Sequence, residues 1–313
     1  MTGIGLFAIC YLFLGGVGAG TCTIASLFAL LTPKEACTAM AESISGRNKR
    51  CVLAASYEHR RLISPLFALS FSCMALGSFF LIADLGVADR ILALFFSGRV
   101  TYLTVGAYSL TTCMILTLLL TTAWCPATTK WRFSVVQVLH VLAFGTSFVV
   151  AVYTGLLLSS MQSVPFWHSA WLPALFTASA LSCGCAITVA TACLTGASNY
   201  FGTVLTNVMK LDIGAIILEL VFLVGLFTNA YFSSYEVLSQ SVCDLLMGEY
   251  APGFLTAVCG CGLAVPLVAE TSLLFLQKHS EVFMLVVAAA VCVGGYALRY
   301  YVVIAGLHVP VWL

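Results

Sequence analysis

The chain has 313 residues, of which 61% are hydrophobic and only 8% are charged, and its formal net charge is +1 at pH 7. A soluble domain carries about 25% charged residues, so this composition excludes a soluble globular protein and indicates an integral membrane protein. Nucleic acid is also excluded as a partner, because binding to phosphates needs a concentrated basic face.

Eight apolar runs are long enough to cross the hydrocarbon core of a bilayer, which takes about 20 helical residues. The first run lacks the basic start of a signal peptide and is longer than one, so we expect it to be retained as a helix. The sequence therefore predicts an all-α integral membrane protein with eight transmembrane helices. They cover approximately residues 3–31, 62–84, 100–124, 133–160, 170–194, 211–233, 251–276 and 281–305.

The connections between these runs are short, and the longest, about 32–61, cannot build a core of its own. We therefore treat residues 1–313 as a single polytopic membrane domain. Within it we expect two bundles of four helices, at about 3–160 and 170–305, with the polar connection 195–210 near the split.

Lysine and arginine are distributed unevenly between the two ends of the predicted helices. Only Arg90 and Arg99 lie in connections on one side, whereas the opposite side is rich in cations and is therefore expected to be cytoplasmic. Both termini are then outside a cell's inner (cytoplasmic) membrane, and so are the loops 85–99, 161–169 and 234–250. The cytoplasmic cations are Lys34, Arg47, Lys49, Arg50, Arg60, Arg61, Lys130, Arg132, Lys210 and Lys278.

The first run contains YLFLGGVGAG, residues 11–20, in which four of ten residues are glycine. Each glycine costs a helix about 1 kcal/mol relative to alanine, so its repeated use needs a physical reason. Without side chains, a neighbouring helix or a flat ring can lie directly on the backbone, and Gly16 with Gly20 forms a small-xxx-small pair. Close helix packing and the wall of a ligand pocket both fit this pattern.

Fourteen cysteines and five histidines raise the question of a metal or haem. The C-x-C pairs, Cys183 with Cys185 and Cys259 with Cys261, lie in predicted helices, where residues two apart do not share a face. The other cysteines are mostly scattered singly through apolar runs, as small hydrophobic residues. A membrane cytochrome b needs facing histidines within its helices, and only His140 lies deep in one. The sequence therefore predicts that this chain binds no metal or haem.

Several ionisable residues lie within the predicted helices, where each is costly unless it is paired or hydrated. Asp212 and Glu219 are seven residues apart, so they share a helix face and are separated by about 10 Å along its axis. They form either a fragment of a proton path or an internal ion-pair network in which Arg299 neutralises one acid. Glu270 lies at a comparable depth, and Asp84 ends the second helix on the outer side.

Four stretches of sequence carry a resemblance that covers nearly the whole chain. They are YLFLGGVGAG in the first helix, IADLGVADR closing the second, YTGLLLSSMQSVPFWHSAWLPALFTASALSCG across the fourth and fifth, and GGYALRYYVVIAG in the eighth. In this order they resemble the NrfD/PsrC family, the membrane subunits of polysulfide-reductase-type molybdopterin oxidoreductases. The third helix departs from the family, because it begins SGRVTYLTVGAYSL where the family usually shows a Pro-Met-Ser-Trp-Gly-like run.

The resemblance implies a membrane anchor without a metal of its own that binds a menaquinone-type quinone near the outer face. It exchanges electrons with an iron–sulfur subunit docked there, which relays them to a catalytic molybdopterin subunit. Tyr153, at a depth comparable to that of Tyr11, offers a phenol to a quinone carbonyl, although tyrosines also form interfacial belts. The candidate quinone-pocket residues are Tyr11, Gly15, Gly16, Gly18, Gly20, Tyr153, Phe166 and Trp167, and the candidate proton-transfer residues are Asp84, His168, Asp212 and Glu219.

An ion-coupled secondary transporter is the alternative, because eight helices with buried Asp212, Glu219, Glu270 and Arg299 also suit transport. Paired broken helices in an inverted repeat would favour a transporter. Neighbouring genes for an iron–sulfur protein and a molybdopterin enzyme would favour the electron-transfer subunit.

Overall fold

The computed structural model describes residues 5–32, 38–42, 49–53, 57–85, 102–125, 131–161, 164–198, 200–233, 236–276 and 280–307. Within these ranges eight helical spans are long and apolar enough to cross a membrane, which confirms the predicted fold class. Seven are α1 (Leu6–Leu31), α3 (Tyr57–Leu85), α5 (Tyr102–Trp124), α6 (Phe133–Ser159), α7 (Trp171–Leu194), α8 (Gly202–Tyr231) and α12 (Glu281–Leu307), and the eighth joins α10 (Ala251–Phe254), η1 (Leu255–Ala264) and α11 (Val265–Leu276).

Two spans are longer than the apolar runs that predicted them. Helix α8 begins at Gly202 instead of about residue 211, and α3 begins at Tyr57 instead of about residue 62. Polar and charged residues in these first turns interrupt the apolar run but do not break the helix, because their side chains reach the aqueous boundary while the backbone continues its hydrogen bonds. The helix bounds therefore extend past the hydrophobic signal.

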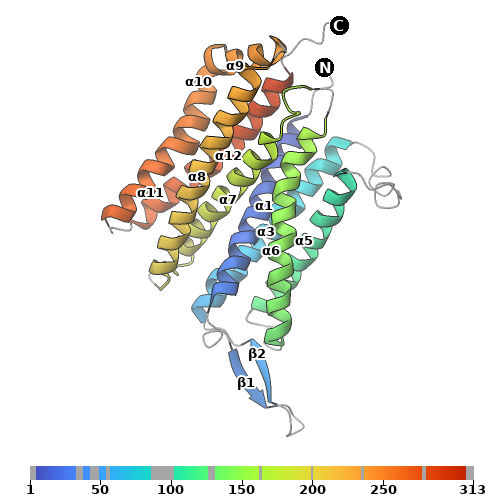
Figure 1. Ribbon diagram of the computed structural model, residues 1–313. Helices are drawn as coiled ribbons and strands as arrows, with labels where there is room; N and C mark the ends of the chain where they lie inside the picture. The colour runs from blue at the N-terminus through green and yellow to red at the C-terminus, as the bar shows by residue number, and fades with distance from the viewer. Residues whose placement is uncertain are drawn as a thin grey trace.

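Three local elements go beyond the predicted spans. The connection between α1 and α3 contains an antiparallel hairpin of β1 (Thr38–Glu42) and β2 (Lys49–Leu53), in which Met40 pairs with Cys51. Helix α9 (Glu236–Met247) lies across the end of the bundle and packs against α8, α10 and α12 (Figure 1). The segment η1 is π-helical, a conformation that often marks functional or strained sites.

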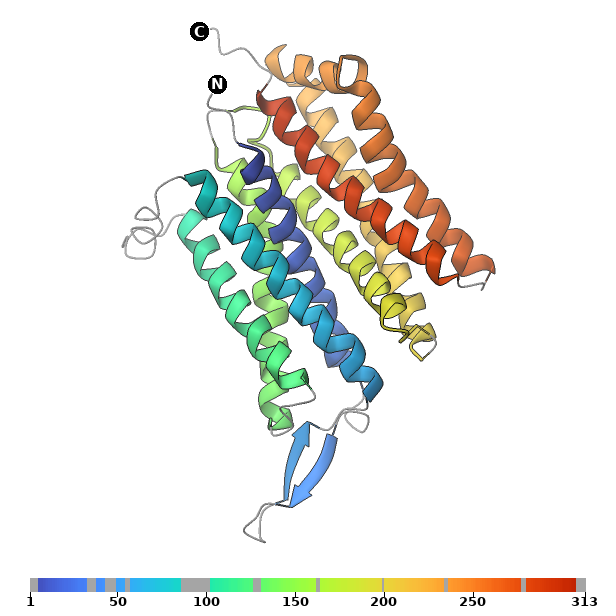
Figure 2. The ribbon, with the colours of Figure 1, turned by 180° about the vertical axis from the view of Figure 1, so that it is seen from behind.

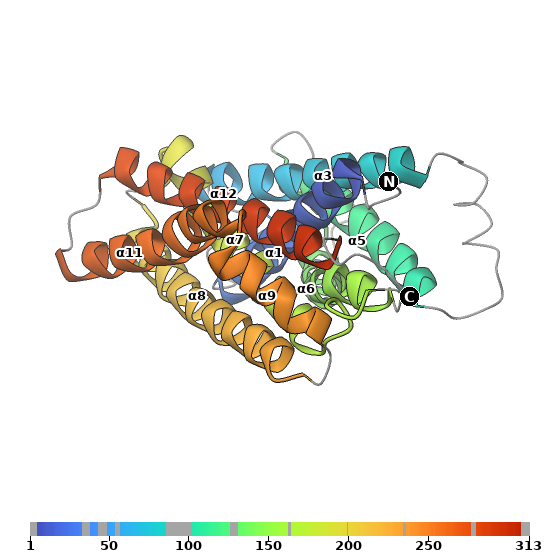
Figure 3. The same cartoon turned by 90° about the horizontal axis from the view of Figure 1, so that it is seen from above.

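Helices α1 and α7 form the centre of the bundle. Helix α1 packs against α3, α6, α7 and α12, and α7 also packs against α6, α8 and α12 (Figures 2 and 3). Buried residues make up 72% of the most apolar stretch of α1 and 78% of that of α7, against 28% to 44% in the other spans. The division into two four-helix bundles stays a prediction, and α1 and α7 lie where its two halves meet.

The first and last spans define the two ends of the molecule. Helix α1 begins, and α12 ends, at the end that carries α9, and the β1–β2 hairpin lies at the opposite end (Figure 1). We name these the outer end and the inner end, after the predicted orientation. The predicted outer loop 85–99, with Asp89, Arg90 and Arg99, lies outside the described residues except for Leu85.

The orientation is testable with a reporter fused to the C-terminus. The charge distribution places this terminus outside the cytoplasm, so an alkaline phosphatase fused after residue 313 is expected to be active and a fluorescent protein that folds only in the cytoplasm is expected to be dark. The opposite pair of results would reverse the orientation. A fusion within the 195–201 connection, at the inner end, is the control and should give the reversed pattern.

Candidate functional site

Tyr11 and Tyr153 meet near the outer end of the bundle. Tyr11 is the sixth residue of α1, and Tyr153 lies six residues before the end of the antiparallel α6, so both phenols lie about 8–9 Å from the helix ends. Their phenol side chains lie close enough to interact with each other. Tyr11 is 1% exposed and Tyr153 is 5% exposed, so the pair is enclosed by the bundle. The structure thus brings together the two tyrosines that depth alone had matched.

A glycine of α5 that was not among the predicted site residues lies directly against the ring of Tyr153. A Cβ added to Gly106 would collide with the ring of Tyr153, so only glycine lets the ring lie on the α5 backbone. Gly106 belongs to the stretch SGRVTYLTVGAYSL, where the chain departs from the family pattern. An isolated glycine within an apolar helix often marks the close approach of a neighbouring group, so this pattern could have identified Gly106 from the sequence.

The glycines of α1 face several different neighbours. Gly20 lies against the backbone of Ala180 on α7, and Gly18 contacts Met74 and the carbonyl of Ser70 on α3. Gly16 faces the guanidinium of Arg299, whose Nη2 would lie 2.8 Å from an added Cβ. Gly15, in contrast, faces the ring of Tyr11, at 3.6 Å from an added Cβ. Gly18 and Gly20 therefore occupy helix-packing positions, and Gly15 lies next to the tyrosine pair.

The loop between α6 and α7 separates two cavities at the outer end. A cavity of about 490 Å³ is lined by Leu156, Ser159 and His168, and one of about 500 Å³ is lined by Phe166, His168 and Leu238, among others. Small-molecule sites typically occupy about 300–1,000 Å³, so both are large enough for a ring ligand. The exposed His168 faces both cavities, and its Nδ1 lies 3.3 Å from the carbonyl of Ser159.

Trp167 and Asp84 hold helix ends in place. The indole of Trp167 is 1% exposed and donates a 3.0 Å hydrogen bond to the carbonyl of Val302 on α12. The carboxylate of Asp84, at the end of α3, lies beside Gly5, with Oδ1 2.6 Å from a Cβ added there. Gly5 caps the start of α1, so a carboxylate there complements the positive end of the helix dipole. The predicted pocket residues therefore divide between the tyrosine pair, the loop cavities and the helix contacts.

Arg299 is the centre of a buried polar network that joins α12 to α1, α7 and α8. It is fully buried, and Nε donates to the carbonyl of Leu12 at 3.2 Å while Nη1 donates to Ser179 at 3.1 Å. The carboxyl group of Glu219 lies near Ser179, and its charge interacts with that of Arg299. Arg299 and Glu219 are thus close enough for their charges to interact, but Nη2 of Arg299 has no hydrogen-bond partner among the described residues, and the choice between an ion-pair network and a proton path stays open.

Asp212 lies one layer deeper, with a different set of partners. It is 1% exposed and accepts a 2.6 Å hydrogen bond from Ser182 on α7. Its carboxyl group also lies within hydrogen-bonding reach of Glu270 on α11, which is 4% exposed. The structure therefore brings Asp212 together with Glu270, which the sequence analysis placed only at a comparable depth.

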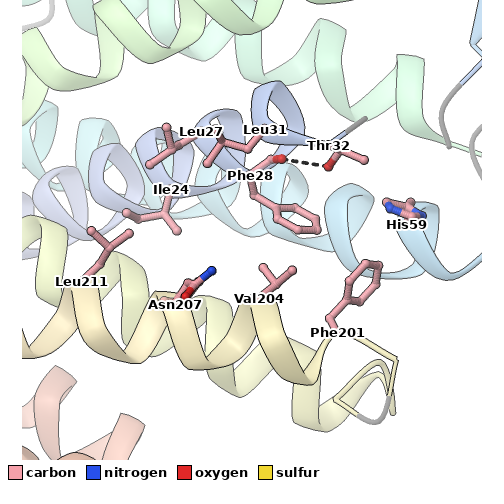
Figure 4. Close-up of a pocket in the computed structure, with 11 residues that line it drawn as sticks. Ile24, Leu27, Phe28, Leu31, Thr32, His59, Phe201, Val204, Asn207 and Leu211 are labelled. Carbon is pink, nitrogen blue, oxygen red and sulfur yellow. Dashed lines mark hydrogen bonds between the residues drawn. The ribbon is translucent and has the colours of Figure 1, made fainter. Parts of the chain in front are cut away.

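A third cavity, of about 290 Å³, lies at the inner end between α1, α3 and α8 (Figure 4). Apolar side chains such as Ile24, Val204 and Leu211 line most of it, and Phe28, Phe201 and His59 surround its inner end. The ring of His59 lies edge-on to that of Phe201, with the centroids 4.9 Å apart. None of the residues predicted from the sequence to form a site lines this cavity.

His140, the one deep histidine, takes part in a structural hydrogen bond. Its Nε2 accepts a 3.0 Å hydrogen bond from the indole of Trp124, and the side chain is 2% exposed. Among the described residues, no group of three or more His, Cys, Asp or Glu side chains is arranged to hold a metal ion. The residues Cys183, Cys185, Cys259 and Cys261 of the two C-x-C pairs are free thiols.

Comparison with known proteins gives consistent matches. A family model described as "Polysulphide reductase, NrfD" matches residues 4–311. The chain is 32% identical over 174 residues to the C subunit of polysulfide reductase from Wolinella succinogenes, covering 56% of this chain and 55% of that protein. It is 28% identical over 169 residues to protein NrfD of Escherichia coli, covering 54% of this chain and 52% of that protein. The alignments thus span about half the length of these curated relatives.

Proposed function

The chain belongs to the polysulphide reductase NrfD family, and on that premise we propose that it is the membrane anchor and quinone-reactive subunit of a respiratory complex. In this role it lies in the inner (cytoplasmic) membrane and exchanges electrons between menaquinone or menaquinol and an iron–sulfur subunit docked at the outer end. A molybdopterin subunit bound to that partner carries out the terminal reaction. The family match along residues 4–311 is the observation that carries the proposal.

Features of the outer end support a quinone site there. The ring binds in an apolar space and its carbonyl oxygens accept hydrogen bonds, which a tyrosine hydroxyl supplies. Tyr11 and Tyr153 provide two such hydroxyls, enclosed between α1, α5 and α6. Gly15 leaves the face of the Tyr11 ring free of a side chain. We assign the quinone headgroup to this region, with Tyr153 as the donor to one carbonyl and Tyr11 orienting the Tyr153 hydroxyl.

Two ionisable residues near the outer surface are the candidates for exchanging the protons of the reaction. Reduction of a quinone forms two O–H bonds and consumes two electrons and two protons, and oxidation of a quinol reverses both. His168 is exposed between the two loop cavities, and Asp84 is exposed at the end of α3. Both lie on the side where the proposal places the iron–sulfur partner, and we assign them to proton exchange with the outer surface.

The proposal predicts a selective loss of quinol-dependent turnover in Tyr153→Phe. The substitution keeps the ring on Gly106 and removes only the hydroxyl, and one lost hydrogen bond is worth about 0.5–1.5 kcal/mol, which is a several-fold to tenfold rise in KM for the quinol. Gly106→Val pushes the ring itself aside and is expected to have the larger effect. The measurement is turnover of the isolated complex with a soluble quinol analogue.

Two comparisons make this test specific. Activity with an artificial donor that feeds the catalytic subunit directly should be unchanged in both variants, because their partners are intact. Tyr231→Phe, at the exposed outer end of α8, is the matched control and should keep normal quinol kinetics. If Tyr153→Phe and Gly106→Val both retain the KM of the natural protein, the quinone binds elsewhere. If the purified chain brings no iron or molybdenum with it, the proposed function itself is wrong.

A further inference from the structure

We propose that Asp212 and Glu270 form a proton-binding carboxyl pair that exchanges protons with the inner side of the membrane during turnover. The inference rests on the proposed function for its driving reaction, since quinone chemistry supplies the turnover. It goes beyond that function, because the proposed quinone site and its proton-exchanging residues lie at the outer end. The pair instead lies in the inner half of the membrane-spanning helices α8 and α11.

Each carboxyl group of the pair has an oxygen without a hydrogen-bond donor, and one proton between the two groups would satisfy both. Oδ1 of Asp212 accepts from Ser182 at 2.6 Å, but neither Oδ2 of Asp212 nor Oε2 of Glu270 receives a donor from the described residues. The two carboxyl groups nevertheless lie within hydrogen-bonding reach of each other. Two ionised carboxylates so close together in a buried place repel, whereas one shared proton turns the same contact into a hydrogen bond.

Among the described residues around the pair, the titratable groups that interact with it do not include a cation. The neighbouring titratable groups on α7 and α12 are the thiols of Cys185 and Cys292, and on α8 it is Glu219. Arg299 instead donates to Ser179 and to backbone carbonyls, and its charge interacts with that of Glu219. A proton on the pair is therefore the charge that balances it.

A small cavity lies between the pair and the inner end. Its volume is about 10 Å³, at the lower limit of a space that holds one water molecule, and Glu270 forms part of its wall. Its other lining residues include Met209 and Leu273, each one helical turn nearer to the inner end than Asp212 and Glu270, and Met284 near the inner start of α12. Glu270 lies six residues from the end of α11, about 9 Å along the axis. The cavity and this short distance are the features that favour exchange with the inner side over exchange with the outer side.

Proton exchange is measured with the intact complex, purified through a tag on this chain and inserted into liposomes that enclose a pH-sensitive dye. The measured quantity is the number of protons exchanged at the inner face for each two electrons transferred from the quinol. We expect the natural protein to show such exchange and Glu270→Gln to lower the ratio at least tenfold. The amide that this substitution introduces can still donate to Asp212, so the variant keeps the contact and the fold.

A second measurement does not depend on turnover. Infrared spectra of the natural protein are expected to contain the absorption of a protonated buried carboxyl group that shifts in heavy water and is lost in Glu270→Gln. The matched control is Glu281→Gln, at the inner start of α12, where the exposed carboxylate accepts from Ser198 at 2.6 Å. This variant should keep both the infrared band and the proton ratio.

The outcomes separate this inference from the proposed function. Quinol turnover by the natural protein without proton exchange at the inner face would overturn the pair as a proton site and leave the quinone function standing. Absence of the carboxyl band, which would mean that neither acid holds a proton, would overturn it as well. If the natural protein shows no quinol turnover at all, the proposed function fails, and the infrared band alone decides whether the pair holds a proton.

Discussion

Replacing Arg299 with methionine is expected to lower the free energy of unfolding by about 3–5 kcal/mol, the usual cost of leaving a buried charge without its partner. The guanidinium is fully buried, donates to Leu12, Ser179 and Gly295, and balances the charge of Glu219. The guanidinium carbon of Arg299, Cζ, also lies 5.3 Å from the centre of the Phe176 ring, which adds a cation–π contact. Methionine fills much of the volume but removes the charge and all of the donors.

The measurement is thermal unfolding of the purified protein in detergent, where a loss of this size corresponds to a drop in Tm on the order of 10 °C. The double variant Arg299→Met, Glu219→Gln removes both charges and is expected to regain part of the loss, because the remaining amide leaves no buried carboxylate unpaired. Arg61→Met, an exposed arginine at the inner end, is the control and should change Tm little. A double variant no more stable than Arg299→Met would mean that Glu219 is not the charge that Arg299 balances.

Replacing Gly184 with leucine is expected to separate the two central helices and to prevent accumulation of the folded protein. A Cβ at this position would collide with the backbone of Gly20 on α1, and it would lie 2.8 Å from the backbone nitrogen of Thr21. Overpacking of a core usually costs about 1–3 kcal/mol because side chains can move aside. At Gly184 the added side chain would meet the backbone of α1, which cannot move aside as a side chain can. The clash is relieved only if α1 moves away from α7, so the loss in free energy of unfolding is expected to exceed that range.

Abundance in the membrane fraction and the detergent Tm measure this effect. Gly145→Leu is the matched control, because nothing lies within 4 Å of a Cβ added there. Gly145 lies in α6, a membrane-spanning helix as α7 is, so the control differs from the test in contacts and not in the type of element. Equal abundance and equal Tm in the two variants would show that α1 and α7 do not depend on this contact.

Much of the membrane architecture follows from the sequence because hydropathy is a local property. A run of about 20 apolar residues must satisfy its backbone hydrogen bonds within itself when it crosses a bilayer, and an α-helix does this without any partner. The eight spans are therefore predictable one by one. Helix α9 was missed because it is short and amphipathic, and the inner end of α8 was missed because its polar first turns give no hydropathy signal.

The candidate site was only partly predictable, because helix periodicity gives a residue's depth and direction on its own helix but not the helix that it faces. Depth alone matched Tyr11 with Tyr153, and the two side chains lie close enough to interact. The glycine stretch fitted both helix packing and a pocket wall, and only the neighbours of each glycine in the structure distinguish the two. Gly20 packs on α7, while Gly15 lies on the Tyr11 ring. The role of Gly106 depends on a ring contributed by another helix, so no property of α5 alone could reveal it.

By itself, the sequence determined the class of the protein, its eight spans, its family and the presence of costly charges within the membrane, because composition, hydropathy and ordered motifs are read along one chain. Only the tertiary structure decided which charges meet. Asp212 and Glu219 share a helix face, yet Asp212 lies with Ser182 and Glu270 whereas Glu219 lies near Ser179 and Arg299. Electrostatic interactions fall off with distance through space and not along the chain, so the partners of a buried charge are fixed when α7, α8, α11 and α12 pack together.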